Sequence, residues 1–237
     1  MIPKTIHYCW FGGPKDDLIL RCIESWKKFC PDYKIIEWNE GNFDINKSEF
    51  TKKMYAQKKW AFVSDYARFK ILNDNGGIYL DTDMLLVKPL DNLLQNSFFS
   101  AYEDDKYISC GAIGAEENNA LIKKCLNYYN ENTDKLILSQ ISVPKILTSC
   151  YNNLSNNEKE NIKIYPKNYF YPFNQFEIKK FNGNNAPSES YGVHLWNYSW
   201  GNPMFRFLNK FKFYNSFKKI LGILGIKKII KKLLNIA

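Results

Sequence analysis

The chain has 237 residues, of which 45% are hydrophobic and 16% aromatic. Such a chain can bury a sizeable core, which excludes a disordered protein and indicates one main domain with appendages. The formal net charge is +9, but nine of the 33 basic residues lie after residue 204, where no acidic residue occurs. The other 24 basic residues balance the 24 acidic ones, so the main domain does not have the charge of a nucleic-acid-binding protein.

The first sixty residues alternate between strand and helix signals. We predict strands at residues 5–10 and 33–38 and helices at residues 18–29 and 48–59. This alternation is typical of an α/β sheet covered on both faces. The first strand ends at Gly12-Gly13-Pro14 without a G-x-G-x-x-G sequence, so a dinucleotide fingerprint is absent. Position alone favours a core role for Trp10 and a structural role for His7.

The sequence AFVSDYARFKILNDNGGIYLDTD, residues 61–83, is the most informative stretch. Apolar residues at helical spacing predict a buried helix that ends at Gly76 and Gly77, followed by a short strand at residues 78–80. Alternation along that strand would direct Tyr79, Asp81 and Asp83 to one side. Repulsion between the two aspartate carboxylates would either raise the pKa of one of them or be neutralised by a bound cation, and we favour the cation.

Asp65 and Arg68 lie three residues apart on the same predicted helix, so their side chains share a face and can meet. A surface ion pair is one interpretation. Because the flanking positions are mostly apolar, we favour a covered pair whose charges need partners, and a nucleotide's ribose and phosphates would supply them.

The segment SDYARFKILNDNGGIYLDTDMLL resembles the DXD signature of glycosyltransferase family 32 and, more distantly, the glucosylating domain of the large clostridial toxins. A D-x-D sequence alone is weak evidence, but S-D-x-x-R followed by G-G-x-Y-x-D-x-D is specific. The opening I-H-x-x-W-F-G-G and the late YGVHLWNYSW also match the family. The resemblance implies a GT-A-type, Rossmann-like mixed sheet flanked by helices over residues 1–204.

Further elements follow the central stretch. We predict strands at residues 98–102 and 162–165, and helices at residues 120–129 and at 136–150 with an interruption near Pro144. Glu103, Asp104 and Asp105 could form a second metal cluster, but an acidic surface turn is the favoured interpretation. Residues 108–115 match the family segment that lies near the donor sugar.

The resemblance also assigns roles to individual residues. Asp81 and Asp83 would hold Mn²⁺ or Mg²⁺. His194 on its own would more often be a core residue, but beside two carboxylates it is a candidate third ligand, in a donor set that suits these ions better than zinc. Trp196 is assigned to the core. The remaining expected contacts to the nucleotide sugar come from Trp10, Tyr79, Asp65, Arg68, Ser199 and Trp200, whose indole N–H would be donated to the leaving diphosphate.

The C-terminal tail, residues 205–237, predicts two short basic amphipathic helices. In the last one, four apolar residues share a face opposite four lysines: Ile226, Ile229, Ile230 and Leu233 against Lys227, Lys228, Lys231 and Lys232. We expect the tail to bind an anionic membrane surface, although the first apolar stripe could instead pack on the domain. The sequence has no signal peptide and no run of about 20 apolar residues, so we expect a protein on the cytoplasmic face of the membrane.

These observations together predict a metal-dependent retaining glycosyltransferase. It would move a hexose from a nucleotide sugar to a saccharide acceptor, and the resemblance favours UDP over GDP. The acceptor would be lipid-linked, in bacterial surface polysaccharide synthesis. Two alternatives remain open at this point: a haloacid-dehalogenase-like phosphatase using Asp81 as nucleophile, and a catalytically silent membrane-binding module.

Overall fold

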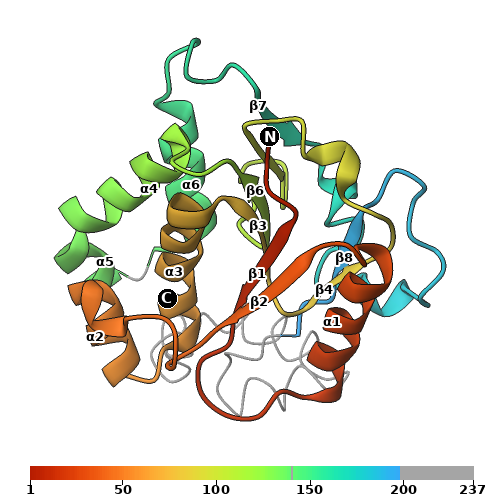
Figure 1. The fold of residues 1–237 in the computed structure, drawn as a ribbon, viewed down its shortest axis with the longest axis horizontal. Coiled ribbons are helices and arrows are strands. Elements are labelled where there is room, and N and C mark those ends of the chain that lie inside the picture. Colours follow the sequence, from red (N-terminus) through yellow and green to blue (C-terminus); the bar gives the residue numbers. More distant parts are fainter. Residues whose placement is uncertain (140, 198–237) are drawn as a thin grey trace, which may run out of the picture. The chain divides into compact units, whose positions relative to one another are not determined.

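A six-stranded mixed sheet forms the centre of the molecule (Figure 1). Its order is β2-β1-β3-β6-β5-β7; β1 pairs in parallel with β2 and β3, β6 is antiparallel to β3 and β5, and β7 is parallel to β5. A separate antiparallel pair joins β4 to β8. The strands are β1 Thr5–Cys9, β2 Lys34–Trp38, β3 Gly77–Leu80, β4 Met84–Leu86, β5 Phe98–Ala101, β6 Ala112–Ala115, β7 Ile162–Tyr165 and β8 Gly192–His194.

The computed structural model describes residues 1–139 and 141–197. The chain divides into two units, the first being Met1–Trp196. The predicted boundary after residue 204, the predicted tail helices, Ser199 and Trp200 lie outside the described residues. Among the helices within them, none combines the length and the apolar character needed to cross a membrane.

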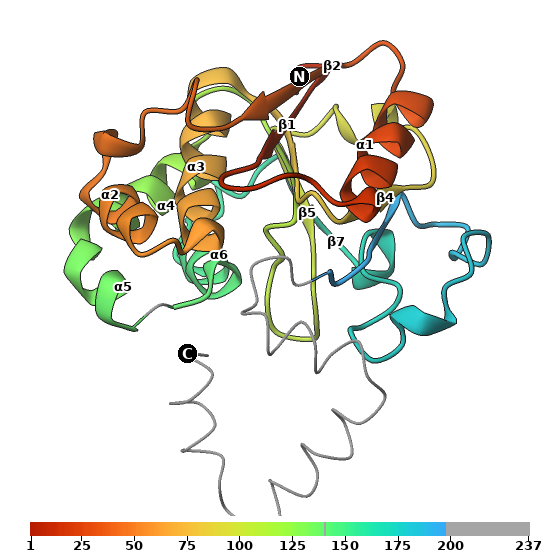
Figure 2. The same cartoon turned by 90° about the horizontal axis from the view of Figure 1, so that it is seen from below.

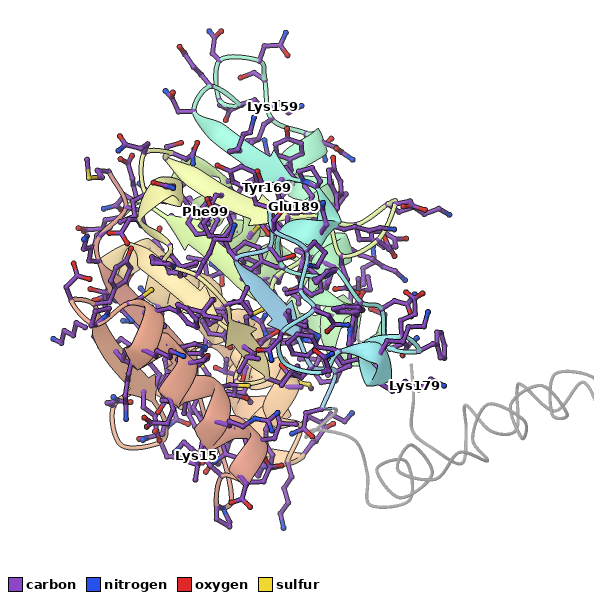
Figure 3. The ribbon with its side chains drawn as sticks, turned by 90° about the vertical axis from the view of Figure 1, so that its right-hand side faces the viewer. Lys15, Phe99, Lys159, Tyr169, Lys179 and Glu189 are labelled. Atoms are coloured by element: carbon purple, nitrogen blue, oxygen red, sulfur yellow. The ribbon has the colours of Figure 1, made fainter. Side chains whose placement is uncertain are left out.

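Helices cover both faces of the sheet, as the sequence predicts. Figures 1 and 2 show α2 to α6 together on one side, and α1 with the β4–β8 pair on the other. Each side encloses its own buried apolar cluster. Phe99 belongs to the cluster on the α1 side, whereas Lys15, Lys159 and Lys179 lie at the periphery of the domain (Figure 3). The helices are α1 Asp17–Phe29, α2 Glu49–Ala56, α3 Trp60–Asn75, α4 Ala120–Glu131, α5 Thr133–Ser139 and α6 Val143–Asn152.

Local sequence explains where these elements begin and end. The Asp16 carboxylate accepts a hydrogen bond from the Ile19 amide and caps α1. The helix predicted at residues 136–150 with an interruption near Pro144 consists of two helices, α5 and α6, and the break between them lies just before the proline. Pro144 lies in the first turn of α6, where its missing N–H is tolerated, so the proline begins a helix rather than interrupting one.

The passage from α3 into β3 depends on two glycines with positive φ, Gly76 at +62° and Gly77 at +94°. This confirms the predicted glycine stop. His7 lies against the same turn: its Nε2 is 3.1 Å from the Gly76 carbonyl oxygen, and its Nδ1 accepts the Trp38 indole N–H at 3.0 Å. Burial lowers the pKa of His7 to about 4. The histidine is therefore structural, as expected.

Gly77→Ala should destabilise the protein by at least about 2 kcal/mol, because positive φ and overpacking each add a cost. A Cβ at this position would lie 2.7 Å from the Thr5 carbonyl oxygen. Gly183→Ala is the matched control, since Gly183 has φ +97° and no atom within 4 Å of the added Cβ. Urea unfolding should show the larger loss for Gly77→Ala. Equal midpoints would contradict the tight β1–β3 contact.

Candidate active site

The two aspartates of the DXD sequence lie in a turn directly after β3. The Asp81 amide donates to the Gly111 carbonyl at 2.8 Å, and the Met84 amide donates back to the Asp81 carbonyl at 2.9 Å. The expected alternation through Asp83 is therefore wrong, because the strand ends at Leu80. The turn, rather than a continuing strand, brings the two carboxylates together.

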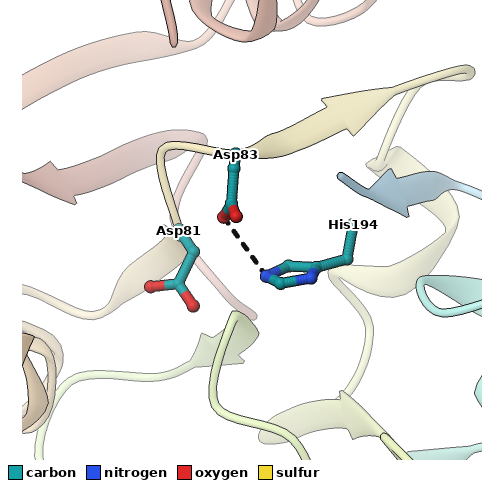
Figure 4. A group of neighbouring side chains, drawn as sticks. All are labelled: Asp81, Asp83 and His194. Atoms are coloured by element: carbon teal, nitrogen blue, oxygen red, sulfur yellow. Dashed lines mark ion pairs between the residues drawn. The ribbon is translucent and has the colours of Figure 1, made fainter. Parts of the chain in front are cut away.

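His194 reaches this turn through the β4–β8 pair, whose register places it opposite Met84. The Leu195 amide also donates to the Asp83 carbonyl at 2.9 Å. Figure 4 shows the result: His194 Nε2 lies 3.2 Å from Asp83 Oδ1, and Asp81 lies beside them. One ligand atom from each of the three residues falls within 4.8 Å of the others. The structure therefore brings Asp81, Asp83 and His194 together, and their role as metal ligands stays a prediction.

The charges of this triad fit a divalent cation. Burial raises the pKa of Asp81, although Arg68 opposes the shift. Burial alone would lower the pKa of His194, but nearby Asp83, Asp81 and Glu103 outweigh it and the net shift is upward. The other ring nitrogen, Nδ1, is buried and has no hydrogen-bond partner in the described part of the chain. Two carboxylates and an imidazole form a donor set that accepts Mn²⁺ or Mg²⁺.

Arg68 connects three parts of the site from within α3. Its Nη2 lies 2.8 Å from Asp65 Oδ1 and its Nη1 lies 3.3 Å from Asp81 Oδ1, while Nη1 also donates to the Cys110 carbonyl at 2.7 Å. The guanidinium lies over the Tyr79 ring, 4.7 Å from its centroid. The Arg68 side chain is only 6% exposed. The predicted Asp65–Arg68 pair is confirmed, and its donors are largely engaged within the protein.

The other predicted site residues take different positions. Tyr79 is buried beneath Arg68. Trp10 is half-buried and donates its indole N–H to the Gly13 carbonyl at 2.6 Å. The nucleotide contacts proposed for Trp10, Tyr79, Asp65 and Arg68 stay predictions, as do the roles of Ser199 and Trp200.

Tyr171, which the sequence did not single out, borders the triad together with Ser109 and Gly111 from the predicted segment 108–115. A Cβ added at Gly111 would lie 2.5 Å from the Tyr171 hydroxyl and 2.7 Å from Asp81 Oδ2, so both groups converge on this glycine. The Ser109 hydroxyl donates to that of Tyr171. Trp196, expected in the core, is half-buried, and its ring meets that of His194 edge-on at 4.5 Å. The aromatic residues around Tyr171 in the sequence could have indicated a contact with the site, but their spacing does not show which ring would face it.

Asp65 should make stability depend on pH. Burial raises its pKa to about 7 even beside Arg68, whereas the unfolded chain releases this proton near pH 4. Between these values the folded state holds the extra proton, so the contribution of Asp65 to the free energy of unfolding falls as pH rises. The decrease should approach about 1.4 kcal/mol per pH unit, and Asp65→Asn should abolish it.

Chemical unfolding of both proteins between pH 4 and 8 measures this difference. Asp105→Asn, at a side chain 93% exposed, is the control. Parallel stability curves for the wild type and Asp65→Asn would contradict the assignment.

Comparison with known proteins identifies the class of enzyme. Residues 16–100 match the family described as glycosyltransferase sugar-binding region containing DXD motif, and residues 114–215 match the alpha 1,4-glycosyltransferase conserved region. An uncharacterized glycosyltransferase, L373, of Acanthamoeba polyphaga mimivirus is 28% identical over 198 residues, 76% of either chain. Human alpha-1,4-N-acetylglucosaminyltransferase is 26% identical over 157 residues, 60% of this chain and 45% of that one.

The apo-form glycosyltransferase GlyE of Streptococcus pneumoniae TIGR4 shares the fold, with a TM-score of 0.50 and 11% identity over 81% of this chain and 54% of that one. All these matches are to glycosyltransferases, so the phosphatase and the silent membrane module are set aside. The chain is a glycosyltransferase with a GT-A fold, and its two halves match two glycosyltransferase family models, the first of which contains the DXD motif.

Proposed function

We propose that this glycosyltransferase is metal-dependent and transfers a hexose from a nucleotide sugar, preferably a UDP-sugar, to a saccharide acceptor with retention at the anomeric carbon. The observation that carries the proposal is the convergence of Asp81, Asp83 and His194 within 4.8 Å at the carboxyl end of β3. Ligands of α/β sheets bind at this end of the strands. Breaking the glycosidic bond of a nucleotide sugar leaves a diphosphate, whose negative charge must be stabilised where it develops.

Each residue of the site would have its own role in stabilising this charge and positioning the donor. Asp83 and Asp81, with His194, would hold Mn²⁺ or Mg²⁺, which would supply positive charge to the diphosphate oxygens as a Lewis acid. Arg68 keeps Asp81 in place from the other side, through the 3.3 Å contact. Asp65, which is held by Arg68, is largely buried but keeps 14% of its side chain exposed, and it can accept a hydrogen bond from ribose or sugar. Trp200 would donate its indole N–H to the leaving group.

Retention is supported by the relatives. The human and mouse relatives are named as alpha-1,4-N-acetylglucosaminyltransferase and lactosylceramide 4-alpha-galactosyltransferase, and an α-linked product made from an α-linked nucleotide sugar retains the configuration. We assign no covalent nucleophile and infer a front-face displacement, in which the acceptor hydroxyl attacks from the side that the diphosphate leaves. The mouse relative's name specifies a glycolipid acceptor, which accords with a lipid-linked saccharide here.

Asp83→Asn should reduce metal-dependent donor hydrolysis by about 100-fold or more, because removing a group that positions charge at the leaving diphosphate has effects of this size. The assay is release of nucleoside diphosphate from UDP-glucose, UDP-galactose, UDP-N-acetylglucosamine and GDP-mannose with Mn²⁺. The wild type should release it slowly from one donor and lose this activity with EDTA.

Asp105→Asn is the matched control, since it removes an exposed carboxylate from a neighbouring loop, and it should hydrolyse the donor like the wild type. Circular dichroism confirms that each variant is folded. Full hydrolysis by Asp83→Asn would contradict the metal assignment. A wild type that neither hydrolyses nor binds any of the nucleotides would contradict the proposed function itself.

We further propose that the basic tail holds the enzyme on the cytoplasmic face of an anionic membrane, where lipid-linked acceptors of surface polysaccharide synthesis lie. The support is the sequence of residues 205–237, with nine basic residues, no acidic residue and apolar stripes at helical spacing.

Truncation after Phe205 should abolish sedimentation with phosphatidylglycerol vesicles and leave donor hydrolysis within about twofold, because residues 1–205 keep every proposed site residue. Replacement of Lys227, Lys228, Lys231 and Lys232 by glutamate in the full chain is the companion variant, and it should also release the protein from vesicles. Vesicle binding by the truncated protein equal to that of the full chain would overturn the anchor assignment.

A further inference from the structure

The loop between β5 and β6 carries three acidic residues with different surroundings. Figure 2 shows this connection extending beyond the sheet. Asp104 and Asp105 are exposed, and the Asp104 carboxylate closes the turn by accepting the Lys106 and Tyr107 amides, each at 2.8 Å. Glu103 is half-buried instead. The predicted acidic surface turn therefore describes Asp104 and Asp105 but is wrong for Glu103.

The backbone of Glu103 is fixed in strand-like pairing. The Tyr102 amide donates to the Tyr165 carbonyl at 3.0 Å, Tyr102 pairs with Ile108, and the Glu103 amide donates to the Tyr107 carbonyl at 2.9 Å. The alternation of β5 therefore continues beyond its last residue. Phe99 and Ala101 point into the cluster that contains Tyr171 and Leu195, so Glu103, two residues further on, points to the same side.

This side is the one on which the triad lies. The negative charge of Glu103 helps to raise the pKa of both His194 and Tyr171, while burial raises the pKa of Glu103 itself. Glu103 is not among the residues whose ligand atoms converge within 4.8 Å. It borders the candidate metal site without belonging to the ligand set.

The carboxylate of Glu103 has no hydrogen bond or ion pair within residues 1–139 and 141–197. Neither Glu103 oxygen is among the fully buried polar atoms that lack a partner, so the carboxylate is open to a ligand, and a ligand hydroxyl could replace solvent there. If the nucleotide diphosphate lies at Asp81, Asp83 and His194, the hexose bonded to it is the nearest ligand with hydroxyl groups. The half-buried ring of Trp196, 4.5 Å from the His194 ring, adds an apolar surface beside this position.

We propose that Glu103 accepts a hydrogen bond from a hydroxyl of the transferred hexose and thereby selects the donor sugar. The inference rests on the proposed use of a nucleotide sugar at the triad. A carboxylate that pairs with one hydroxyl discriminates between hexoses that differ in the orientation of that group, because the wrong epimer displaces solvent from the half-buried carboxylate without giving it that hydrogen bond.

The test compares the binding of UDP, which lacks the sugar, with that of UDP-glucose and UDP-galactose by calorimetry in the presence of Mn²⁺. Wild type, Glu103→Gln, Glu103→Ala and the control Asp105→Asn are measured. We expect both Glu103 variants to bind UDP within twofold of the wild type, which also shows that they are folded. Their affinity for the preferred UDP-hexose should fall about 10-fold or more, and the preference between the two hexoses should narrow.

Unchanged affinity for the UDP-hexoses in both variants would overturn the inference. An equal loss for UDP and UDP-hexose would also overturn it, because Glu103 would then act on the metal or the diphosphate. Wild type that fails to bind UDP with Mn²⁺ would contradict UDP-sugar use, and with it this inference. Loss of UDP binding in Asp83→Asn alone supports the proposed function independently of Glu103.

Discussion

The buried guanidinium of Arg68 is the interaction on which the site depends. It joins α3 to the end of β3 through Asp81, to the β5–β6 loop through the Cys110 carbonyl, and to its own helix through Asp65. Removing one partner of such a buried ionic network costs about 3–5 kcal/mol, because the remaining charges lose their compensation. Arg68 thus sets the position of Asp81 before any ligand arrives.

Charge compensation differs between the side of the site that Arg68 forms and the side that Asp83 and His194 form. Arg68 balances Asp65 and part of Asp81 from inside the domain, whereas Asp83 faces His194 across the β4–β8 pair. The second side carries more acidic than basic groups, and burial has already raised the pKa of Asp81. A divalent cation and a diphosphate are complementary to this arrangement, since the cation neutralises the carboxylates and attracts the phosphates.

The sequence could predict what depends on neighbours along the chain. The α3 helix, its glycine stop, β3 and the Asp65–Arg68 pair all follow from spacing within residues 61–83, and the structure has each of them. The separate β4–β8 sheet could not be predicted in this way, because its two strands are distant in sequence and only their pairing brings His194 to Asp83. The family resemblance, rather than any local pattern, indicated that histidine.

Glu103 shows the same limit of prediction from sequence, because its neighbours along the chain indicate exposure and the fold half-buries it. Three consecutive acidic residues normally indicate a solvated turn, and two of the three are exposed. The difference arises from one extra strand-like step at Tyr102, which keeps the alternation of β5 and directs Glu103 toward the triad. Its carboxylate oxygens stay open to solvent, since neither is among the fully buried polar atoms that lack a partner. A sugar hydroxyl can therefore replace solvent at this carboxylate, and a site that gains its hydrogen bond only from the correct hydroxyl derives specificity from the partial burial around it.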